Sequence, residues 1–272
     1  MTGRRSPLPF IAAGACAVGL VVVAVVALDT SAGQARDVAI LHGFSGLDRP
    51  RVSDGLEVIG RSVDPLPYAL GGLACIAVAL ARGRPWRAVT AGVVLLGTGA
   101  TAQGLKHLLA DQRFAPWLRF DQIDAASFPS GHATAAMTLA LCAVMVAPPA
   151  WRALTALLAG ACAVGIAYAT LALSWHYPSD VLAGFLLAGL WASLGLAALQ
   201  RLEPAAAEPA GAVPWEPLVL VGAIGAVGGA ALVGAASDGV AQYAMQRPTV
   251  IAAALTIAIL ALGLAATVVA AD

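Results

Sequence analysis

Charged side chains are scarce in this sequence. Only 11% of its 272 residues are Asp, Glu, Lys or Arg, and 60% are apolar. Soluble globular domains carry about 25% charged residues, so a water-soluble fold is excluded. The formal net charge at pH 7 is zero, which gives no indication of nucleic-acid binding. The composition is that of an integral membrane protein embedded in a lipid bilayer.

The cysteines are few and follow no pattern. Cys16, Cys75, Cys142 and Cys162 all fall within apolar runs, without the spacing of a metal site or a disulfide framework. We interpret them as small packing residues of membrane helices.

Long apolar runs predict the fold class and the domain organisation. A helix needs about 20 apolar residues to cross a bilayer, and strands do not fit runs of this length. The runs predict spans at 8–28, 65–81, 88–105, 131–147, 153–173, 181–199, 218–236 and 250–270. We therefore expect an all-α, polytopic helical bundle. Residues 1–200 would form a six-span core, 201–217 a linker, and 218–272 two additional transmembrane helices.

The first apolar run has two interpretations. Arg4 and Arg5 before an apolar stretch are also typical of a cleavable signal peptide. The apolar region of a signal peptide usually has about 7–15 residues, and the run at 8–28 is longer. We therefore favour an uncleaved span. Residues 29–64 then form a polar connection, in which 52–59 is amphipathic enough to lie along the membrane surface.

The positions of the arginines predict the orientation in the cell membrane. Short cytoplasmic loops collect Lys and Arg, and the short loop after the second span contains Arg82, Arg84 and Arg87. The N-terminus is therefore expected in the cytoplasm. The loops at 106–132 and 174–180 then both face the extracytoplasmic side.

Groups that can bind phosphate gather in the first of these loops. Ser130 is a favourable N-cap for a helix beginning at Gly131, and the free amides at such a helix end attract anions. Lys106, the only lysine in the chain, and Arg113 can both bind phosphate oxygens.

Two histidines and a carboxylate provide groups suited to hydrolysis. His132 follows the N-cap and is placed to protonate a departing alkoxide. His176 can attack phosphorus if a carboxylate binds its other ring nitrogen. With Pro178 as the first helical residue, Asp180 lies in the first turn and faces back toward His176.

These residues form three motifs that resemble those of the type 2 phosphatidic acid phosphatase superfamily of membrane lipid phosphatases. The family motifs are Lys-six residues-Arg-Pro, Pro-Ser-Gly-His, and Ser-Arg-five residues-His-three residues-Asp. Lys106 and Arg113 match the first motif, and residues 129–132 match the second in full. His176 and Asp180 match the third. The resemblance covers about residues 8–199.

The resemblance implies a metal-independent lipid phosphate phosphatase that needs no cofactor. His176 would be the nucleophile that becomes phosphohistidine, Asp180 its partner and His132 the general acid. The implied phosphate-binding residues are Lys106, Arg113, Ser130 and Gly131. Suitable substrates are a polyprenyl phosphate or diphosphate of cell-envelope synthesis, phosphatidic acid and phosphatidylglycerol phosphate.

Two positions depart from the family motifs. Phe114 replaces the usual proline, and Ala169-Thr170 replaces Ser-Arg, so one phosphate-binding guanidinium is missing. Arg119 is the nearest spare cation, and we consider it a further candidate for phosphate binding. The alternative function is a catalytically weakened lipid-phosphate binder or carrier.

Overall fold

The computed structural model describes residues 6–48, 52–119, 122–203 and 246–271, and all regular structure in these ranges is helical. Six helices are long and apolar enough to cross a membrane. They are α1 (Leu8–Asp29), α5 (Pro85–Leu108), the segment Ala125–Val146, which ends in α6 (Gly131–Val146), α7 (Pro149–Ala172), α8 (Pro178–Leu202) and α11 (Pro248–Ala271). The all-α membrane fold is thereby confirmed. The span expected at 218–236 and most of the linker expected at 201–217 lie outside the described residues.

The second predicted span is α4 (Pro65–Ala81), with the expected bounds. α3 (Ser53–Arg61) precedes it and is joined to it with a bend of 51°. α3 overlaps residues 52–59, for which the sequence indicated an amphipathic surface helix, and its apolar Val58 is exposed. The two helices therefore form one broken element rather than a single straight span.

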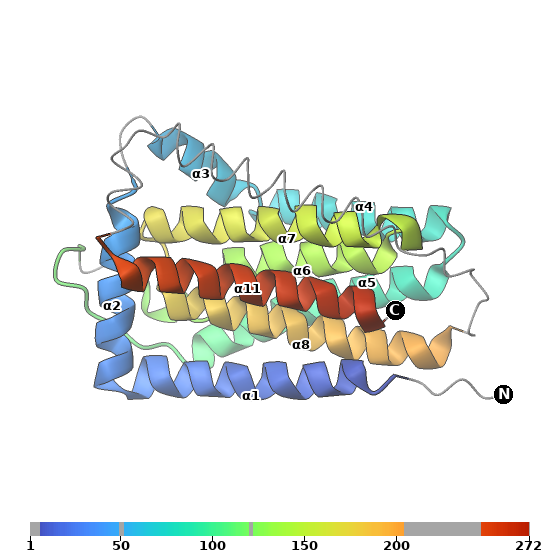
Figure 1. Cartoon of the computed structure of the whole chain (residues 1–272), viewed down its shortest axis with the longest axis horizontal. Helices are drawn as coiled ribbons and strands as arrows, with labels where there is room; N and C mark the ends of the chain where they lie inside the picture. The colour runs from blue at the N-terminus through green and yellow to red at the C-terminus, as the bar shows by residue number, and fades with distance from the viewer. Residues whose placement is uncertain (1–5, 49–51, 120–121, 204–245, 272) are drawn as a thin grey trace.

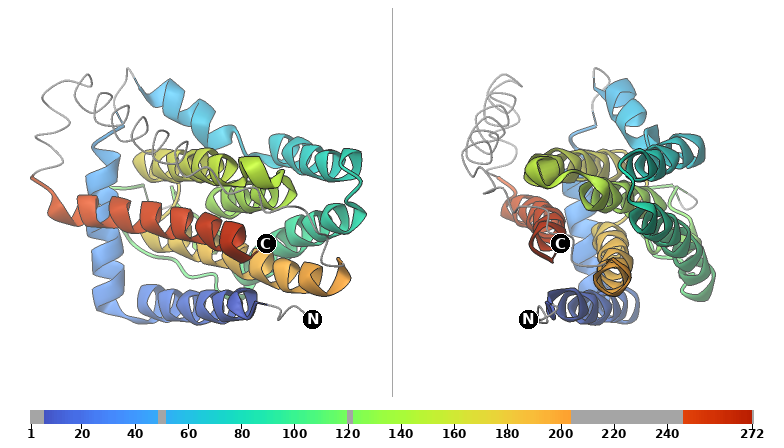
Figure 2. Two further views of the ribbon diagram at one scale, coloured as in Figure 1. Left: turned by 45° about the vertical axis from the view of Figure 1, so that its right-hand side comes forward. Right: turned by 90° about the vertical axis from the view of Figure 1, so that its right-hand side faces the viewer.

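The polar segment after α1 contains a helix that the sequence analysis did not predict. α2 (Ser31–Ser45) begins after Thr30, whose hydroxyl accepts a hydrogen bond from the amide of Gly33 at 3.0 Å. α2 crosses one end of the bundle instead of running along it (Figures 1 and 2). It buries Leu41 and Phe44, which are three residues apart on one helical face.

The N-terminal ends of α6 and α8 lie unusually close together. A Cβ atom on Gly184 of α8 would lie 2.8 Å from the Thr134 hydroxyl and 3.0 Å from the Ser130 carbonyl oxygen of α6. Only glycine permits this approach. The polar residues at the start of both helices are thereby brought to the same end of the bundle.

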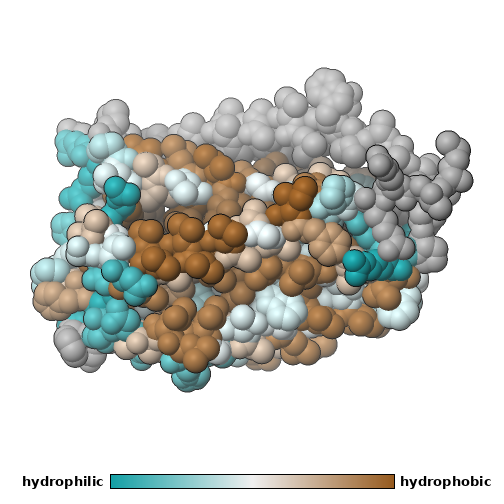
Figure 3. All heavy atoms as spheres, turned by 90° about the horizontal axis from the view of Figure 1, so that it is seen from below, coloured by the Kyte–Doolittle hydropathy of each residue, from teal (hydrophilic) through white to brown (hydrophobic). Residues whose placement is uncertain are grey.

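The C-terminal end of α6 lies at the opposite end of the bundle, among arginines. Arg82, Arg87 and Arg152 donate hydrogen bonds of 2.6 to 3.2 Å to the carbonyl oxygens of residues 145–147. These cations satisfy the last carbonyls of α6 and complement its dipole. Polar residues thus gather at both ends of the molecule, with an apolar belt between them (Figure 3).

The close approach at Gly184 generates a stability prediction. Gly184→Ala should lower the unfolding free energy by about 1–3 kcal/mol, because backbone atoms of α6 cannot yield to the new methyl group. Gly165→Ala is the matched control, because a Cβ atom on Gly165 of α7 would have no atom of a neighbouring element within 4 Å. Thermal unfolding in detergent should show a lower Tm for Gly184→Ala alone, and equal Tm values for the two variants would contradict the packing argument.

Candidate active site

A cavity of about 380 Å³ lies at the end of the bundle where α6 begins. Four residues expected in the site line it, namely Lys106, Gly131, His132 and His176. They come from the last turn of α5, the first turn of α6 and the link between α7 and α8. The fold therefore assembles residues from all three motifs around one cavity.

The start of α6 presents free amides to this cavity. The Ser130 hydroxyl caps the helix by accepting a hydrogen bond from the amide of Ala133 at 3.2 Å. The amides of Gly131 and His132 form no hydrogen bond with the described residues. The Lys106 ammonium lies 3.7 Å from the position that a Cβ atom would take on Gly131. This cluster of donors suits an anion, whereas Ser130 itself is fully buried behind it.

The two histidines face one another across the cavity. Their ring centroids are 5.8 Å apart, and the Trp175 ring lies 5.3 Å from that of His132. One phosphoryl group between the imidazoles would be within contact of both. Within the described ranges, no group of three or more His, Cys, Asp or Glu side chains is arranged to hold a metal ion.

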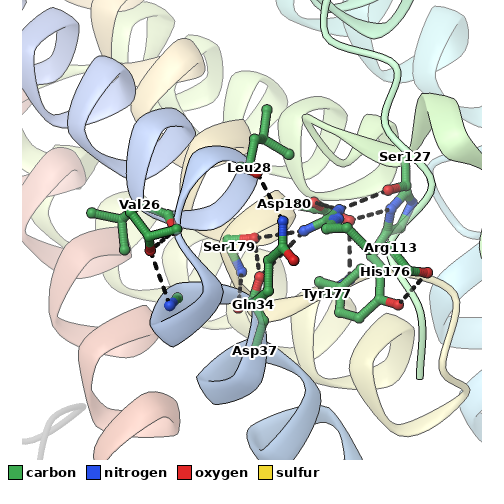
Figure 4. A network of polar contacts seen from close by, with 12 residues as sticks. Val26, Leu28, Gln34, Asp37, Arg113, Ser127, His176, Tyr177, Ser179 and Asp180 are labelled. Carbon is green, nitrogen blue, oxygen red and sulfur yellow. Dashed lines mark hydrogen bonds and ion pairs between the residues drawn. The ribbon is translucent and has the colours of Figure 1, made fainter. Parts of the chain in front are cut away.

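Asp180 is a completely buried carboxylate behind His176 (Figure 4). One of its oxygens accepts a hydrogen bond from the Tyr177 amide at 3.0 Å and lies 3.6 Å from Nδ1 of His176. The latter distance exceeds that of a hydrogen bond, and Nδ1 is buried without another partner. Catalytic hydrogen bonds are often this long before substrate binds. The Asp180 carbonyl also accepts from the Ser130 amide at 2.9 Å, which links the second and third motifs.

Arg113 lies behind the cavity rather than in its lining, so the structure does not present it as a direct phosphate ligand. Its guanidinium is buried because it pairs with carboxylates. Nη2 contacts Asp180 and donates to the Ser127 hydroxyl at 2.8 Å. Nη1 donates to Asp37 at 3.2 Å and to the Ser179 hydroxyl at 3.1 Å. Arg113 therefore holds the carboxylate that serves His176.

Asp37 is a site residue that the sequence analysis missed. This residue of α2 is only 7% exposed, and it accepts hydrogen bonds from both the amide and the hydroxyl of Ser179. Burial raises the pKa of Asp37 to about 6. Once α2 is known to be a helix, the position of Asp37 could be expected, because a residue four positions before Leu41 lies on the same helical face.

Asp64 was also missed, and it lies on the open side of the site. Its Oδ1 is 3.3 Å from Nε2 of His132, and the residue lines the cavity. Proline residues follow it at positions 65 and 67, which the sequence analysis treated only as the beginning of a span.

Thr170, which replaces the arginine of the third motif, and Arg119, the candidate to compensate for it, do not line the cavity. Thr170 is buried at the end of α7, where its hydroxyl donates to the Ala167 carbonyl at 2.8 Å. Arg119 is exposed and lines a small hollow with Arg113 and Tyr177, not the cavity that contains the histidines. The structure therefore does not bring Arg119 to the histidine pair.

Comparisons with known proteins confirm the family expected from the motifs. The PAP2 superfamily model matches residues 87–203. A solved structure, the first transmembrane PAP2 type phosphatidylglycerolphosphate phosphatase from Bacillus subtilis, matches with a TM-score of 0.55 and 21% identity. This match covers 74% of the present chain and 100% of that chain. No curated protein matches. Residues 87–203 therefore match the PAP2 superfamily, and the chain is similar in fold to a PAP2 type transmembrane phosphatase.

The raised pKa of Asp37 predicts how stability depends on pH. The folded state binds a proton at Asp37 more tightly than the unfolded state does, so the unfolding free energy should fall as pH rises from about 4 to about 6. Asp37→Asn resembles the protonated residue and should lose this dependence. Tm values in detergent should therefore be similar for both proteins near pH 4, with the variant the more stable above pH 6. A variant that is less stable at every pH would refute this account.

Proposed function

We propose that this protein is an integral membrane phosphatase that hydrolyses a phosphate monoester or diphosphate carried by a lipid. The observation that carries the proposal is the cavity, because it joins the histidine pair to an apolar interior. Gly99, Ala102, Gln103 and Lys106 line it from one face of α5 over two helical turns. A phosphorylated head group fits the polar end near Lys106, and a hydrocarbon chain fits the small apolar residues deeper in the bundle.

In the first step, a ring nitrogen of His176 attacks phosphorus and the bond from phosphorus to the lipid oxygen breaks. Nε2 is the attacking atom, because Nδ1 faces Asp180. Protonated His132 gives its proton to the departing oxygen, so the lipid leaves as an alcohol, or as a lipid phosphate when the substrate is a diphosphate. His176 is left as phosphohistidine, and buried Asp180 stabilises the charge on its ring.

In the second step, water attacks the phosphohistidine. His132, now neutral, accepts a proton from this water, and the bond from phosphorus to nitrogen breaks to release inorganic phosphate. Lys106 and the amides of Gly131 and His132 bind the phosphate oxygens through both steps. Arg113 keeps Asp180 in place, and Ser130 caps the helix that presents the amides.

The substrate classes remain those implied by the family motifs: polyprenyl phosphates or diphosphates of the envelope, phosphatidic acid and phosphatidylglycerol phosphate. We further propose that the site faces the extracytoplasmic side of the cell membrane. The arginines that bind the C-terminal end of α6 support this orientation, since they lie at the opposite end of the bundle from the cavity.

The mechanism predicts different defects for the two histidines. His176→Ala should abolish phosphate release from every substrate, because no nucleophile remains. His132→Ala should slow release from dodecyl phosphate by about 10²–10³-fold, but release from nitrophenyl phosphate much less, because a good leaving group needs no acid. Phosphate release by purified protein in detergent, with and without a chelator, measures both effects.

Full activity of His176→Ala would end this mechanism. Activity that depends on an added metal ion would contradict a metal-independent reaction. Measurable binding of lipid phosphates without any turnover would favour the alternative, a lipid-phosphate binder or carrier.

The orientation predicts which loops a membrane-impermeant thiol reagent reaches. In a background without the native cysteines, Asp124→Cys should react in whole cells, because residue 124 is exposed in the loop beside the cavity. Gly83→Cys, in the tight turn between α4 and α5, should react only after the membrane is opened. The reverse pattern would place the active site in the cytoplasm.

A further inference from the structure

The carboxylate of Asp64 does not cap the helix that follows it. Asp64 is the N-cap residue of α4, and an Asp at this position usually accepts a hydrogen bond from the second or third helical amide. Its side chain forms no such bond. The third helical residue is Pro67, which has no amide hydrogen to offer.

The same carboxylate instead lies between two cationic groups. Oδ1 is 3.3 Å from Nε2 of His132, and Oδ2 is 3.9 Å from a guanidinium nitrogen of Arg61. The Asp64 side chain is 35% exposed, and it lines the cavity together with Lys106 and His176. A negative charge in a phosphate cavity opposes substrate binding, so helix capping and ground-state binding both fail to explain this residue.

We propose that Asp64 is the positioning residue for His132, a role that rests on the phosphatase activity proposed above. Its carboxylate holds Nε2, which leaves Nδ1 to exchange a proton with the leaving oxygen. No hydrogen bond joins Nδ1 to the described residues. A carboxylate bonded to one imidazole nitrogen orients the ring and stabilises the imidazolium.

The negative charge of Asp64 would stabilise the imidazolium form of His132 in both chemical steps. His132 begins the first step as an imidazolium and becomes neutral when its proton moves to the leaving oxygen. In the second step it becomes an imidazolium again when it takes a proton from the attacking water. The neighbouring groups Lys106 and His176 disfavour a positive charge on His132 when they are themselves protonated. The negative charge of Asp64 offsets this repulsion.

Asp64 lies outside the stretch that matches the family, which begins at residue 87. The general acid of this site therefore depends on a segment before the matched domain. Asp64 lies at the bend of 51° between α3 and α4, because Arg61 ends α3 and Asp64 immediately precedes α4.

The test compares Asp64→Asn with Asp54→Asn, a matched control for an exposed acid on α3. For dodecyl phosphate, Asp64→Asn should lower kcat about tenfold. This loss is smaller than the loss expected for His132→Ala, because the general acid itself remains. KM should fall about threefold, the size expected for removing one partly exposed charge from an anion site. For nitrophenyl phosphate, kcat should change by less than about twofold, because its leaving group needs little protonation.

Two further variants separate positioning from folding. Asp64→Glu restores a carboxylate and should regain most of kcat on dodecyl phosphate. Asp64→Asn should add little to the defect of His132→Ala, because both act through the same imidazole. The Asp54→Asn control should match the parent protein throughout.

Each other outcome overturns the proposal. An equal loss of kcat on both substrates, or a lower Tm with unchanged KM, would mean a structural role for Asp64. Unchanged kinetics in Asp64→Asn would mean no role, while the phosphatase function would stand. A parent protein that hydrolyses neither substrate would remove the phosphatase function and this inference together.

Discussion

The completely buried carboxylate of Asp180 constrains the whole active-site end of the bundle. An unpaired charge in such a place costs several kcal/mol, so its neighbours must supply compensating groups. Arg113 supplies the cation at one oxygen, and the Tyr177 amide donates a hydrogen bond to the other oxygen, beside which His176 also lies. Two segments far apart in the sequence, the loop of Arg113 and residues 176–180, thereby converge on one point. His176 therefore lies beside the same carboxylate that these interactions keep stable.

Helix α6 links this site to the other end of the molecule. Its N-terminus opens toward the cavity, and its last carbonyls bind three arginines. Both ends of its dipole thus meet groups of the favourable sign once an anion occupies the cavity. The close contact at Gly184 holds the starts of α6 and α8 together. The free amides of α6 and the residues at the start of α8 are therefore positioned by packing as well as by hydrogen bonds.

The charges of the site are divided between two layers. Arg113 is engaged by Asp37 and Asp180 in the buried layer, so Lys106 is the cation that lines the cavity with the histidines. Both Asp37 and Asp64 precede the stretch that matches the PAP2 superfamily. The N-terminal helices of this chain consequently contribute to the electrostatics of a site whose motifs lie entirely in the later helices.

The sequence by itself determined the features that depend on local chain geometry. Apolar runs predicted the membrane-spanning helices, Ser130 predicted the N-cap of α6, and Pro178 predicted that Asp180 lies in the first turn of α8. It could not show that Arg113 faces two carboxylates, or that Asp37 and Asp64 join the site. Asp37 contacts Ser179 across 142 positions, and Asp64 contacts His132 across 68. Such pairs arise only when the helices pack, because burial decides which side chains must neutralise one another.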